Sequence, residues 1–401
     1  MTRIAIATGV HLRPQETQIR FHMRTLFGGN TVVLAGKRGE PDPDNRPHLI
    51  WGRSSVPLGL AEEARAFALA AAAYPDTRSL RVPFGARRRM ILEFLAAQGV
   101  DAILAEFGTE AVRLAPVANA AGLPIFAYFR GADASSYLSR GARIAAYRRM
   151  MPRLAGVFSV SRFLLDRLES HVIRHPHAQV VPSGVDVARF QPGKKQPESF
   201  LAVGRFIEKK RPATTVRAFC TAARGHPEAR LEMIGDGPLL EPCRKLAAEL
   251  GMADRVTFHG RQPHDVVAAR LADCAVFLQH SVTGPDGDTE GLPTAIQEAM
   301  AAGMMVIATR HAGIPEAVTE GETGLLVAEG DEAAYTAQIA ETLAGRHDVA
   351  AMGARAREIA CDRFDNRKLI ATVEATLAAA VEAQRNAASQ GAGRVDFSPL
   401  R

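Results

Sequence analysis

The sequence has few cysteines and no long apolar run. Its cysteines, Cys220, Cys243, Cys274 and Cys361, are scattered and form no Cys-x-x-Cys pair. Neither a disulfide framework nor a zinc site is therefore expected, and a reducing cytoplasm fits this composition. No apolar run approaches the roughly 20 residues of a membrane-spanning helix. The opening stretch MTRIAIATGV has no cleavage site behind it, so it predicts a buried first strand and not a signal peptide.

The sequence also lacks a Gly-x-Gly-x-x-Gly fingerprint after this first strand, which argues against a dinucleotide-dependent dehydrogenase. What is present is the composition of a soluble globular protein, with 47% apolar and 23% charged residues over 401 positions, a length that suits two domains. The net charge of +6 is uneven, because residues 1–190 carry +10 and the remainder −4. The basic half predicts an anionic partner, whether membrane surface, phosphate or nucleic acid. Nucleic acid is disfavoured, because no reader motif or aromatic interleaving accompanies the charge.

Short apolar runs alternate with helical patterns along the whole chain. The expected strands are Ile4–Thr8, Thr31–Ala35, Ala102–Ala105, Ile125–Phe129, Val157–Val160 and Val180–Val181, then Phe200–Val203, Leu231–Ile234, Val256–His259, Ala275–Leu278, Met305–Ala308 and Leu325–Val327. This alternation predicts an α/β protein with two Rossmann-like, doubly wound parallel-sheet domains that face each other across a cleft.

The expected domain boundaries follow from the Gly, Pro and Lys content of residues 183–199. An N-terminal domain is predicted over residues 1–182, a linker over 183–199 and a C-terminal domain over 200–360. A last helix, over residues 361–385, is expected to return toward the N-terminal domain. The Gly, Ser and Asn content of residues 386–401 predicts a flexible tail.

The stretch GPDGDTEGLPTAIQEAMAAG, residues 284–303, places an acidic, glycine-rich loop before a short helix. Pro293 suits the first helical position and Gly303 the residue just past the end, which predicts a helix over 293–302. The free N–H groups and positive dipole end of such a helix form an anion site, and Gly291 permits close backbone approach. Glu298 lies roughly 7–8 Å along the axis from Pro293, where a carboxylate can accept two hydrogen bonds from a vicinal diol.

The spacing Glu290-x7-Glu298 is weak evidence by itself, because Glu241/Glu249 and Glu374/Glu382 share it. Glu298 could be an exposed helix residue and Glu290 a first-turn partner of the helix dipole. A second feature adds weight, since Arg205 and Lys210 follow a predicted strand. A guanidinium grips two phosphate oxygens and an ammonium adds a compact charge, although both could simply be solvated.

Five stretches together resemble the family-4 retaining glycosyltransferases of GT-B fold, the group 1 type of bacterial exopolysaccharide and cell-envelope enzymes. Residues 287–327 are similar to the donor-site signature of that family. The others, in the family's order, are VPSGVDVARF (181–190), VGRFIEKKRP (203–212), IGDGPLL (234–240) and VTFHGRQP (256–263). The resemblance covers nearly all of residues 180–330 and is looser before residue 180.

The resemblance implies that Arg205, Lys210 and Glu290 take part in catalysis. It implies that Glu298 binds the ribose of a UDP- or GDP-linked sugar. The loop positions Gly204 and Gly235, and the backbone of Gly291, Leu292 and Pro293, are expected to contact the donor. No metal or other cofactor is expected, and the departing phosphate is expected to help take the acceptor proton.

In the first half, AYFRGADASSY (127–137) resembles the family's His-Gly-x-Asp turn beside the reacting sugar, with Arg130 in the place of the histidine. Arginine cannot act as a base, so Arg130 would hold an acceptor phosphate or the donor sugar. Asp133 either belongs to this site or caps the following helix. Gly9 would serve a close backbone approach, although the family's glycine pair is absent.

Two Asp-x-Asp pairs invite a metal interpretation. Asp42 and Asp44 lie in a proline-rich loop and are expected at the surface, while Asp286 and Asp288 are expected to shape the donor loop. No His/Asp/Glu cluster has convincing ligand spacing. A metal site is therefore not expected.

Two basic segments, ARRRMILEFL (86–95) and SRGARIAAYRRMMPRL (139–154), could lie on anionic lipid or be solvated helices. The expected function is transfer of a hexose-type sugar to a hydroxyl acceptor, such as a lipid-linked oligosaccharide or polysaccharide precursor, in the cytoplasm or at the inner face of the cell membrane. The alternatives are a non-catalytic nucleotide-sugar-binding protein and a GT-B-shaped nucleotide-sugar epimerase.

Overall fold

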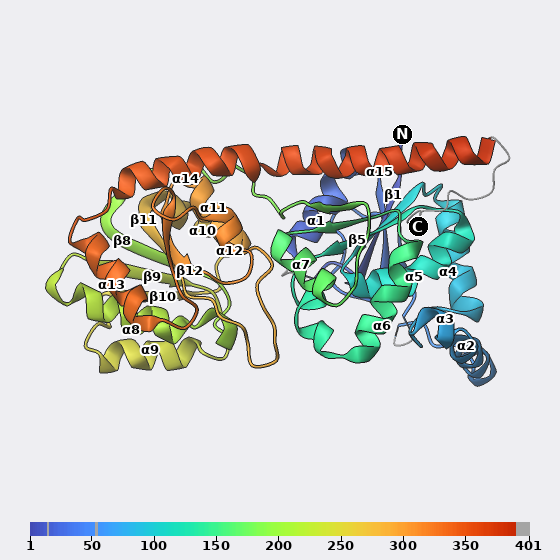
Figure 1. Cartoon of the computed structure of the whole chain (residues 1–401), viewed down its shortest axis with the longest axis horizontal. Coiled ribbons are helices and arrows are strands. Elements are labelled where there is room, and N and C mark those ends of the chain that lie inside the picture. Colours follow the sequence, from blue (N-terminus) through green and yellow to red (C-terminus); the bar gives the residue numbers. More distant parts are fainter. Residues whose placement is uncertain (14–15, 53–54, 390–401) are drawn as a thin grey trace. The chain divides into compact units, whose positions relative to one another are not determined.

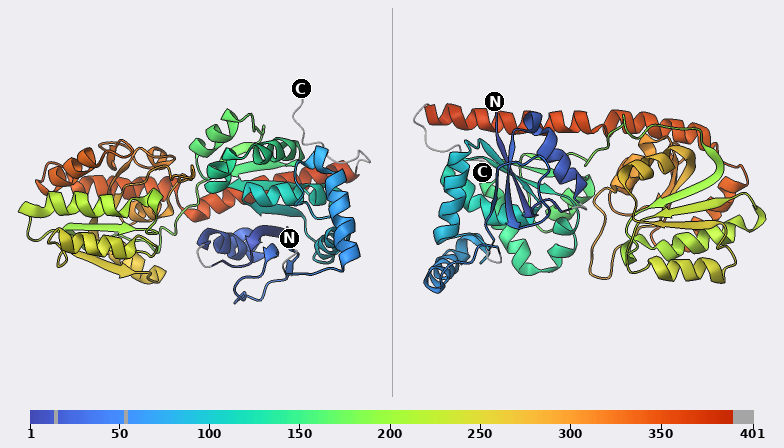
Figure 2. Two further views of the ribbon diagram at one scale, coloured as in Figure 1. Left: turned by 90° about the horizontal axis from the view of Figure 1, so that it is seen from below. Right: turned by 180° about the vertical axis from the view of Figure 1, so that it is seen from behind.

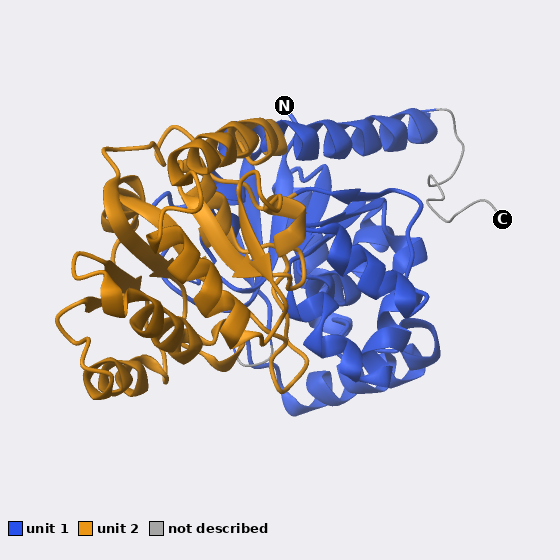
Figure 3. Cartoon of the chain, turned by 60° about the vertical axis from the view of Figure 1, so that its left-hand side comes forward, with its two compact units in different colours: residues 1–181, 370–401 blue, residues 182–369 orange. Residues whose placement is uncertain are grey.

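The computed structural model describes residues 1–13, 16–52 and 55–389, and the chain forms two compact units (Figures 1 and 3). Unit 1 contains Met1–Val181 together with the chain from Ile370 onward, and unit 2 contains Pro182–Leu369. Each unit has one parallel sheet with helices packed against it. The prediction of two doubly wound, Rossmann-like folds is confirmed.

The sheet of unit 1 has seven parallel strands in the order β3-β2-β1-β4-β5-β6-β7. These strands are β1 (Ile4–Val10), β2 (Thr31–Lys37), β3 (His48–Ile50), β4 (Ala102–Glu106), β5 (Ile125–Phe129), β6 (Gly156–Ser159) and β7 (Ala178–Val180). Every residue of β4, β5 and β6 is buried, as expected for strands covered on both faces. The strand order reverses between β1 and β4, and loops that follow the two strands diverge there.

The helices of unit 1 follow the strands along the chain. They are α1 (Thr17–Thr25), α2 (Leu60–Ala72), α3 (Tyr74–Thr77), α4 (Gly85–Ala97), α5 (Gly108–Ala121), α6 (Gly141–Met150), α7 (Arg162–Ser170) and most of α15 (Asn366–Ser389). α5 packs against β4 and β5. α15 is tied to unit 1 by Glu374, whose Oε1 accepts the Phe27 N–H at 2.5 Å, and by Arg385, which lies 2.6 Å from Asp101.

The sheet of unit 2 has six parallel strands in the order β10-β9-β8-β11-β12-β13. These strands are β8 (Gln196–Val203), β9 (Arg230–Ile234), β10 (Val256–Gly260), β11 (Cys274–Gln279), β12 (Met305–Thr309) and β13 (Gly324–Val327). β8 and β11 are neighbours although two strands separate them in sequence, so the strand order reverses between them. In doubly wound sheets this position, at the carboxyl ends of the strands, is where ligands bind.

Two helix layers cover the sheet of unit 2 (Figures 1 and 2). α8 packs against α9 and α13 in one layer, and α11 packs against α10 and α14 in the other. The helices are α8 (Pro212–Ala222), α9 (Leu240–Glu249), α10 (His264–Asp273), α11 (Thr294–Ala301), α12 (Ile314–Ala317), α13 (Glu332–Leu343) and α14 (Val349–Arg363). The buried core between sheet and helices includes Phe200, Phe219 and Tyr335.

The expected strands are all present, with ends that differ from the prediction by a few residues. One further strand, β3, was not predicted from the sequence. It has three residues that are exposed or half-buried, and it follows the proline-rich loop that contains Asp42 and Asp44, so no apolar run marks it. The last helix runs from Asn366 to Ser389, beyond the predicted end, and residues 390–401 of the expected tail lie outside the described part of the chain.

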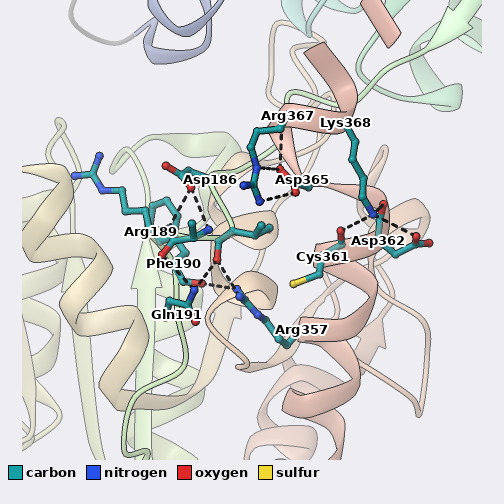
Figure 4. A network of polar contacts seen from close by, with 12 residues as sticks. Asp186, Arg189, Phe190, Gln191, Arg357, Cys361, Asp362, Asp365, Arg367 and Lys368 are labelled. Atoms are coloured by element: carbon teal, nitrogen blue, oxygen red, sulfur yellow. Dashed lines mark hydrogen bonds and ion pairs between the residues drawn. The ribbon is translucent and has the colours of Figure 1, made fainter. Parts of the chain in front are cut away.

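The predicted linker, residues 183–199, lies within unit 2; its last four residues begin β8, and the rest is held by Arg357 of α14 (Figure 4). Its guanidinium donates to the carbonyl oxygens of Val187 at 2.9 Å and Phe190 at 2.6 Å, and also to that of Ala301 at the end of α11. The Gly184 N–H donates to Oε1 of Gln297, another α11 residue, at 3.0 Å. The segment therefore forms part of the support of α11.

Replacing Arg357 with alanine should destabilise unit 2, because three carbonyl groups lose a charged donor at once. We expect a loss of about 2–3 kcal/mol, seen as a fall of roughly 4–12 °C in the temperature of thermal unfolding. Arg355→Ala, which removes an exposed arginine from the same helix, is the matched control and should change this temperature by no more than about 2 °C. Equal effects of the two substitutions would contradict the assigned role.

Candidate active site

Two loops meet at the point where the strand order of unit 2 reverses. One follows β8 and carries Arg205, Lys209 and Lys210, and the other follows β11 and leads into α11. Nζ of Lys210 lies 3.1 Å from Oε1 of Glu290, which joins the two loops. A second ion pair, 2.8 Å between Nζ of Lys209 and Oδ2 of Asp288, lies beside the first. The structure thus brings together two of the residues singled out by sequence, Lys210 and Glu290.

The Lys210–Glu290 pair is largely buried. Burial by itself would raise the pKa of Glu290, but the positive charges of Lys210 and Lys209 outweigh it and hold that pKa at about 2. Burial lowers the pKa of Lys210, against the influence of Glu290. Glu290 is therefore a permanent negative charge at neutral pH and a poor proton acceptor.

Arg205 extends the cationic character of the same loop. Its side chain is exposed and forms no ion pair with any carboxylate among the described residues. The preceding Gly204 has an ordinary environment, since an added Cβ would lie 3.6 Å from Cε of Lys210. Gly235 is different, because its φ is +143° and an added Cβ would lie 1.8 Å from the Gly204 carbonyl oxygen. Glycine at position 235 therefore permits the close contact between the loops that follow β8 and β9.

The helix after the second loop begins at Thr294, so Pro293 is the residue before the first helical turn and not the first helical residue. The predicted start of the helix is therefore wrong by one residue. Five N–H groups at this end have no hydrogen-bond partner within the described ranges; they belong to Gly291, Leu292, Thr294, Ala295 and Ile296. They are available to an anion, and the positive end of the helix dipole favours one. At the other end, Gly303 has a φ of +72°, as expected for a residue that ends a helix.

Glu298 lies on α11 and is half-buried. Burial raises the pKa of Glu298 to about 7, and Arg189 only partly opposes this. A carboxyl group with such a pKa can both donate and accept a hydrogen bond near neutral pH. This suits a partner with two hydroxyl groups and contrasts with the fixed charge of Glu290.

Two residues that sequence reasoning missed, His311 and Glu329, contact the second loop. His311 follows β12, Glu329 follows β13, and Nδ1 of His311 lies 2.8 Å from Oε2 of Glu329. The Glu290 N–H donates to Nε2 of His311 at 3.1 Å. Both residues come directly after predicted strands that are neighbours in the sheet. Polar residues at the carboxyl ends of such strands are candidates for a ligand site, and that rule could have identified them from the sequence.

In unit 1 the residue expected on the acceptor side, Arg130, forms a buried ion pair. Its Nε donates to Oε2 of Glu106 at 2.7 Å, and the other oxygen of Glu106 lies 2.5 Å from Nδ1 of His22. Burial would raise the pKa of Glu106, but Arg130 and His22 hold it at about 2. The Arg130 guanidinium also lies 4.0 Å from the centre of the Tyr128 ring, a cation–π contact. Glu106 was missed by sequence, although a charge at the end of an apolar strand could have marked it.

Asp133 has a structural role in this unit. Its carboxylate accepts N–H groups from Gly108, Gly131 and Arg130 at 2.9–3.1 Å. It therefore holds the start of α5 and shapes the turn after β5, and it does not cap the helices that follow, which was one of the two alternatives for this residue. Gly9 lies in β1, where an added Cβ would make an ordinary 3.5 Å contact with Glu110. The structure of this unit does not require glycine at position 9.

The Asp-x-Asp pairs have local partners. Asp42 and Asp44 contact Arg46, and Asp286 accepts the Asp288 N–H at 3.1 Å within the second loop of unit 2. Across residues 1–13, 16–52 and 55–389, no group of three or more His, Cys, Asp or Glu side chains could hold a metal ion.

Comparisons with known proteins agree on one family. A family model described as glycosyl transferases, group 1, matches residues 185–359. The putative colanic acid biosynthesis glycosyltransferase WcaL of Salmonella typhimurium is 33% identical over 70% of this chain and 72% of its own length. A GDP-mannose-dependent alpha-(1-6)-phosphatidylinositol monomannoside mannosyltransferase of Mycolicibacterium smegmatis is 31% identical over 63% of this chain and 70% of its own. The crystal structure of Anabaena Alr3699/HepE in complex with UDP superposes with a TM-score of 0.76, at 16% identity, over 94% of this chain and all of that one.

The raised pKa of Glu298 predicts a pH-dependent stability. The folded protein keeps this proton up to about pH 7, whereas the unfolded chain releases it near the ordinary 4.5, so the carboxyl group lowers stability increasingly as pH rises through this window. Glu298→Gln should match the wild type at pH 4.5 and exceed its free energy of unfolding by up to about 3 kcal/mol above pH 7. Thermal unfolding at several pH values measures the difference, and a difference independent of pH would contradict this explanation.

Proposed function

The chain belongs to the group 1 glycosyl transferases and has a GT-B fold, and on that basis we propose that it transfers a hexose-type sugar from a nucleoside diphosphate to a hydroxyl acceptor, with retention of configuration and without a metal. The observation that carries the proposal is the Lys210–Glu290 pair beside the unbonded N–H groups at the start of α11. This arrangement offers fixed positive groups to a diphosphate and a fixed negative group to its sugar.

The diphosphate would bind the N–H groups of residues 291–296, with Arg205 and Lys210 on its other side. Cleavage of the glycosyl–phosphate bond leaves negative charge on the nucleoside diphosphate. Two cations and a helix N-terminus stabilise that charge, which supports transfer without a metal. Glu298, just over one turn from the start of α11, would accept hydrogen bonds from the ribose hydroxyl groups or donate to them.

Glu290 is not suited to act as the base. Its pKa of about 2 and its ion pair with Lys210 leave it little tendency to take a proton. It would instead accept hydrogen bonds from the hydroxyl groups of the transferred sugar. The departing phosphate then takes the proton of the acceptor hydroxyl, which requires attack on the same face and retains the configuration.

The acceptor would bind unit 1 near Arg130, whose charge Glu106 fixes in place. The names of the relatives point to polysaccharide and lipid-linked acceptors, namely colanic acid and a phosphatidylinositol monomannoside. Their donors and ligands include GDP-mannose and UDP. A UDP- or GDP-linked hexose and a lipid-linked oligosaccharide or polysaccharide precursor are the proposed substrates.

Contact with the inner face of an anionic membrane is part of the proposal. No helix of the described chain is both long and apolar enough to cross a bilayer. In the two basic segments, for which lipid contact and solvation were both open, some arginines already have acidic partners: Arg87 is buried beside Glu63, and Arg153 lies 2.6 Å from Asp76. The support comes instead from residues 60–80, where five large apolar side chains are exposed; these are Leu60, Phe67, Leu69, Tyr74 and Leu80. Exposed arginines at positions 65, 78 and 81 lie among them, as anionic lipid would favour.

Glu290→Ala and Lys210→Ala should each lower the rate of sugar transfer by at least ~10²-fold, because each removes a charge that stabilises the transition state. Initial rates with UDP-glucose and GDP-mannose over a panel of hydroxyl acceptors measure this. The controls are Glu249→Ala and Lys245→Ala, which remove an exposed glutamate and an exposed lysine from α9. Glu249 also belongs to a Glu-x7-Glu pair, with Glu241, so its replacement tests whether the spacing alone matters. Near-normal transfer by both site variants would refute the assignment.

The wild type distinguishes the alternative functions in the same assays. Nucleotide binding without any turnover would favour a binding protein, and an altered nucleotide sugar formed without acceptor would reveal an epimerase.

Replacing Leu60 and Phe67 together by serine should weaken binding to vesicles of anionic phosphatidylglycerol by about tenfold or more, because burial of such side chains stabilises by about 1.5–3 kcal/mol each. Co-sedimentation measures the bound fraction. Val172→Ser changes an exposed apolar residue of the same unit that lies outside residues 60–80, and should leave binding unchanged. If the wild-type protein does not co-sediment with anionic vesicles, the proposed membrane contact is contradicted.

A further inference from the structure

The loop between β11 and α11 carries Glu290, yet it has no helix or strand of its own. Its two ends are held by a single carboxylate. Oε1 of Glu329 accepts the Thr283 N–H at 2.5 Å, and Oε2 lies 2.8 Å from Nδ1 of His311. Nε2 of His311 in turn accepts the Glu290 N–H at 3.1 Å. Glu329 therefore closes the loop from residue 283 to residue 290, directly at one end and through an imidazole at the other.

These contacts determine the tautomer of His311. A backbone N–H can only donate, so Nε2 must accept and carries no proton. The ring proton is then on Nδ1, where it donates to the Glu329 carboxylate. Both ring nitrogens thus have a partner, Glu329 at Nδ1 and the Glu290 N–H at Nε2.

His311 is itself rigidly held. It is 1% exposed, and its own N–H donates to the Thr309 carbonyl oxygen at 2.8 Å. The same turn contacts the loop a second time, because the Gly313 N–H donates to the Gly291 carbonyl oxygen at 3.1 Å. The main chain on both sides of the Glu290–Gly291 peptide bond is thus fixed from the loop after β12.

We propose that His311 is a positioning residue for the transfer, with Glu329 as the group that orients it. The imidazole fixes the main chain of Glu290, while Lys210 fixes its carboxylate. Together they determine where the carboxylate meets the sugar and where the unbonded N–H groups of residues 291–296 begin. This inference rests on the proposed function, because it assigns a catalytic purpose to the position of Glu290.

Two substitutions separate the contacts of His311. The amide oxygen of glutamine can reach the place of Nε2 and still accept the Glu290 N–H, whereas the shorter asparagine retains only a donor near Nδ1. His311→Asn should lower kcat about 10²-fold, with the KM for the donor changed less than threefold, because misplacement by about an ångström has that cost. His311→Gln should retain at least a tenth of wild-type kcat. His347→Asn, in the connection between α13 and α14, is the control and should remain within twofold of the wild type.

Amide hydrogen exchange of peptides covering residues 283–291 gives a readout that does not depend on turnover. His311→Asn should speed exchange there roughly tenfold, since one hydrogen bond is lost, and leave peptides from α9 unchanged. The kcat and KM values of the His311 variants are measured with UDP-glucose and with GDP-mannose as donors. If the wild type turns over neither, the proposed function fails for these donors, and the exchange still decides the inference. Unchanged exchange in His311→Asn would overturn it, as would equal loss of kcat in the asparagine and glutamine variants.

Discussion

The buried ion pair between Lys210 and Glu290 determines much of the site in unit 2. Two charges removed from water are stable only together, because either one alone would remain uncompensated in a low-dielectric surrounding. The loop after β8 and the loop after β11 must therefore fold against each other. Since β8 and β11 are neighbours where the strand order reverses, the pair forms where a doubly wound sheet leaves room for a ligand.

Unit 1 repeats this arrangement with different residues. Its strand order reverses between β1 and β4, and Glu106, at the end of β4, forms a buried pair with Arg130 from the loop after β5. In each unit a glutamate with a pKa of about 2 lies at the carboxyl edge of the sheet next to a cation. The partner differs, because Arg130 binds through a planar, permanently charged guanidinium and Lys210 through a compact ammonium. Arg130 is thus a compensated charge, integrated into the fold of its unit.

The sequence was informative where the information is local. Apolar runs bounded by Gly and Pro located the long strands, and Pro293 and Gly303 located α11 to within a residue. Contacts between distant segments were not predictable in the same way. Glu106 meets Arg130, and His311 meets Glu290, only because the strand order places their loops together, and no spacing in a single sequence encodes that order. Three-residue β3 was missed because it has no apolar run of its own and is defined by its pairing with β2 at the edge of the sheet.

The two glutamates of the Glu290-x7-Glu298 spacing differ in charge state although only the end of a loop and the first turn of α11 separate them. Both are withdrawn from water, which raises the pKa of a carboxyl group in each case. Lys210 and Lys209 reverse that effect at Glu290, whereas Glu298 has only the weaker influence of Arg189 and keeps a pKa of about 7. Equal spacing therefore does not mean equal chemistry. In the proposed function the fixed charge faces the sugar, whose position must not vary, and the titratable group faces the ribose, where either protonation state can hydrogen-bond a diol.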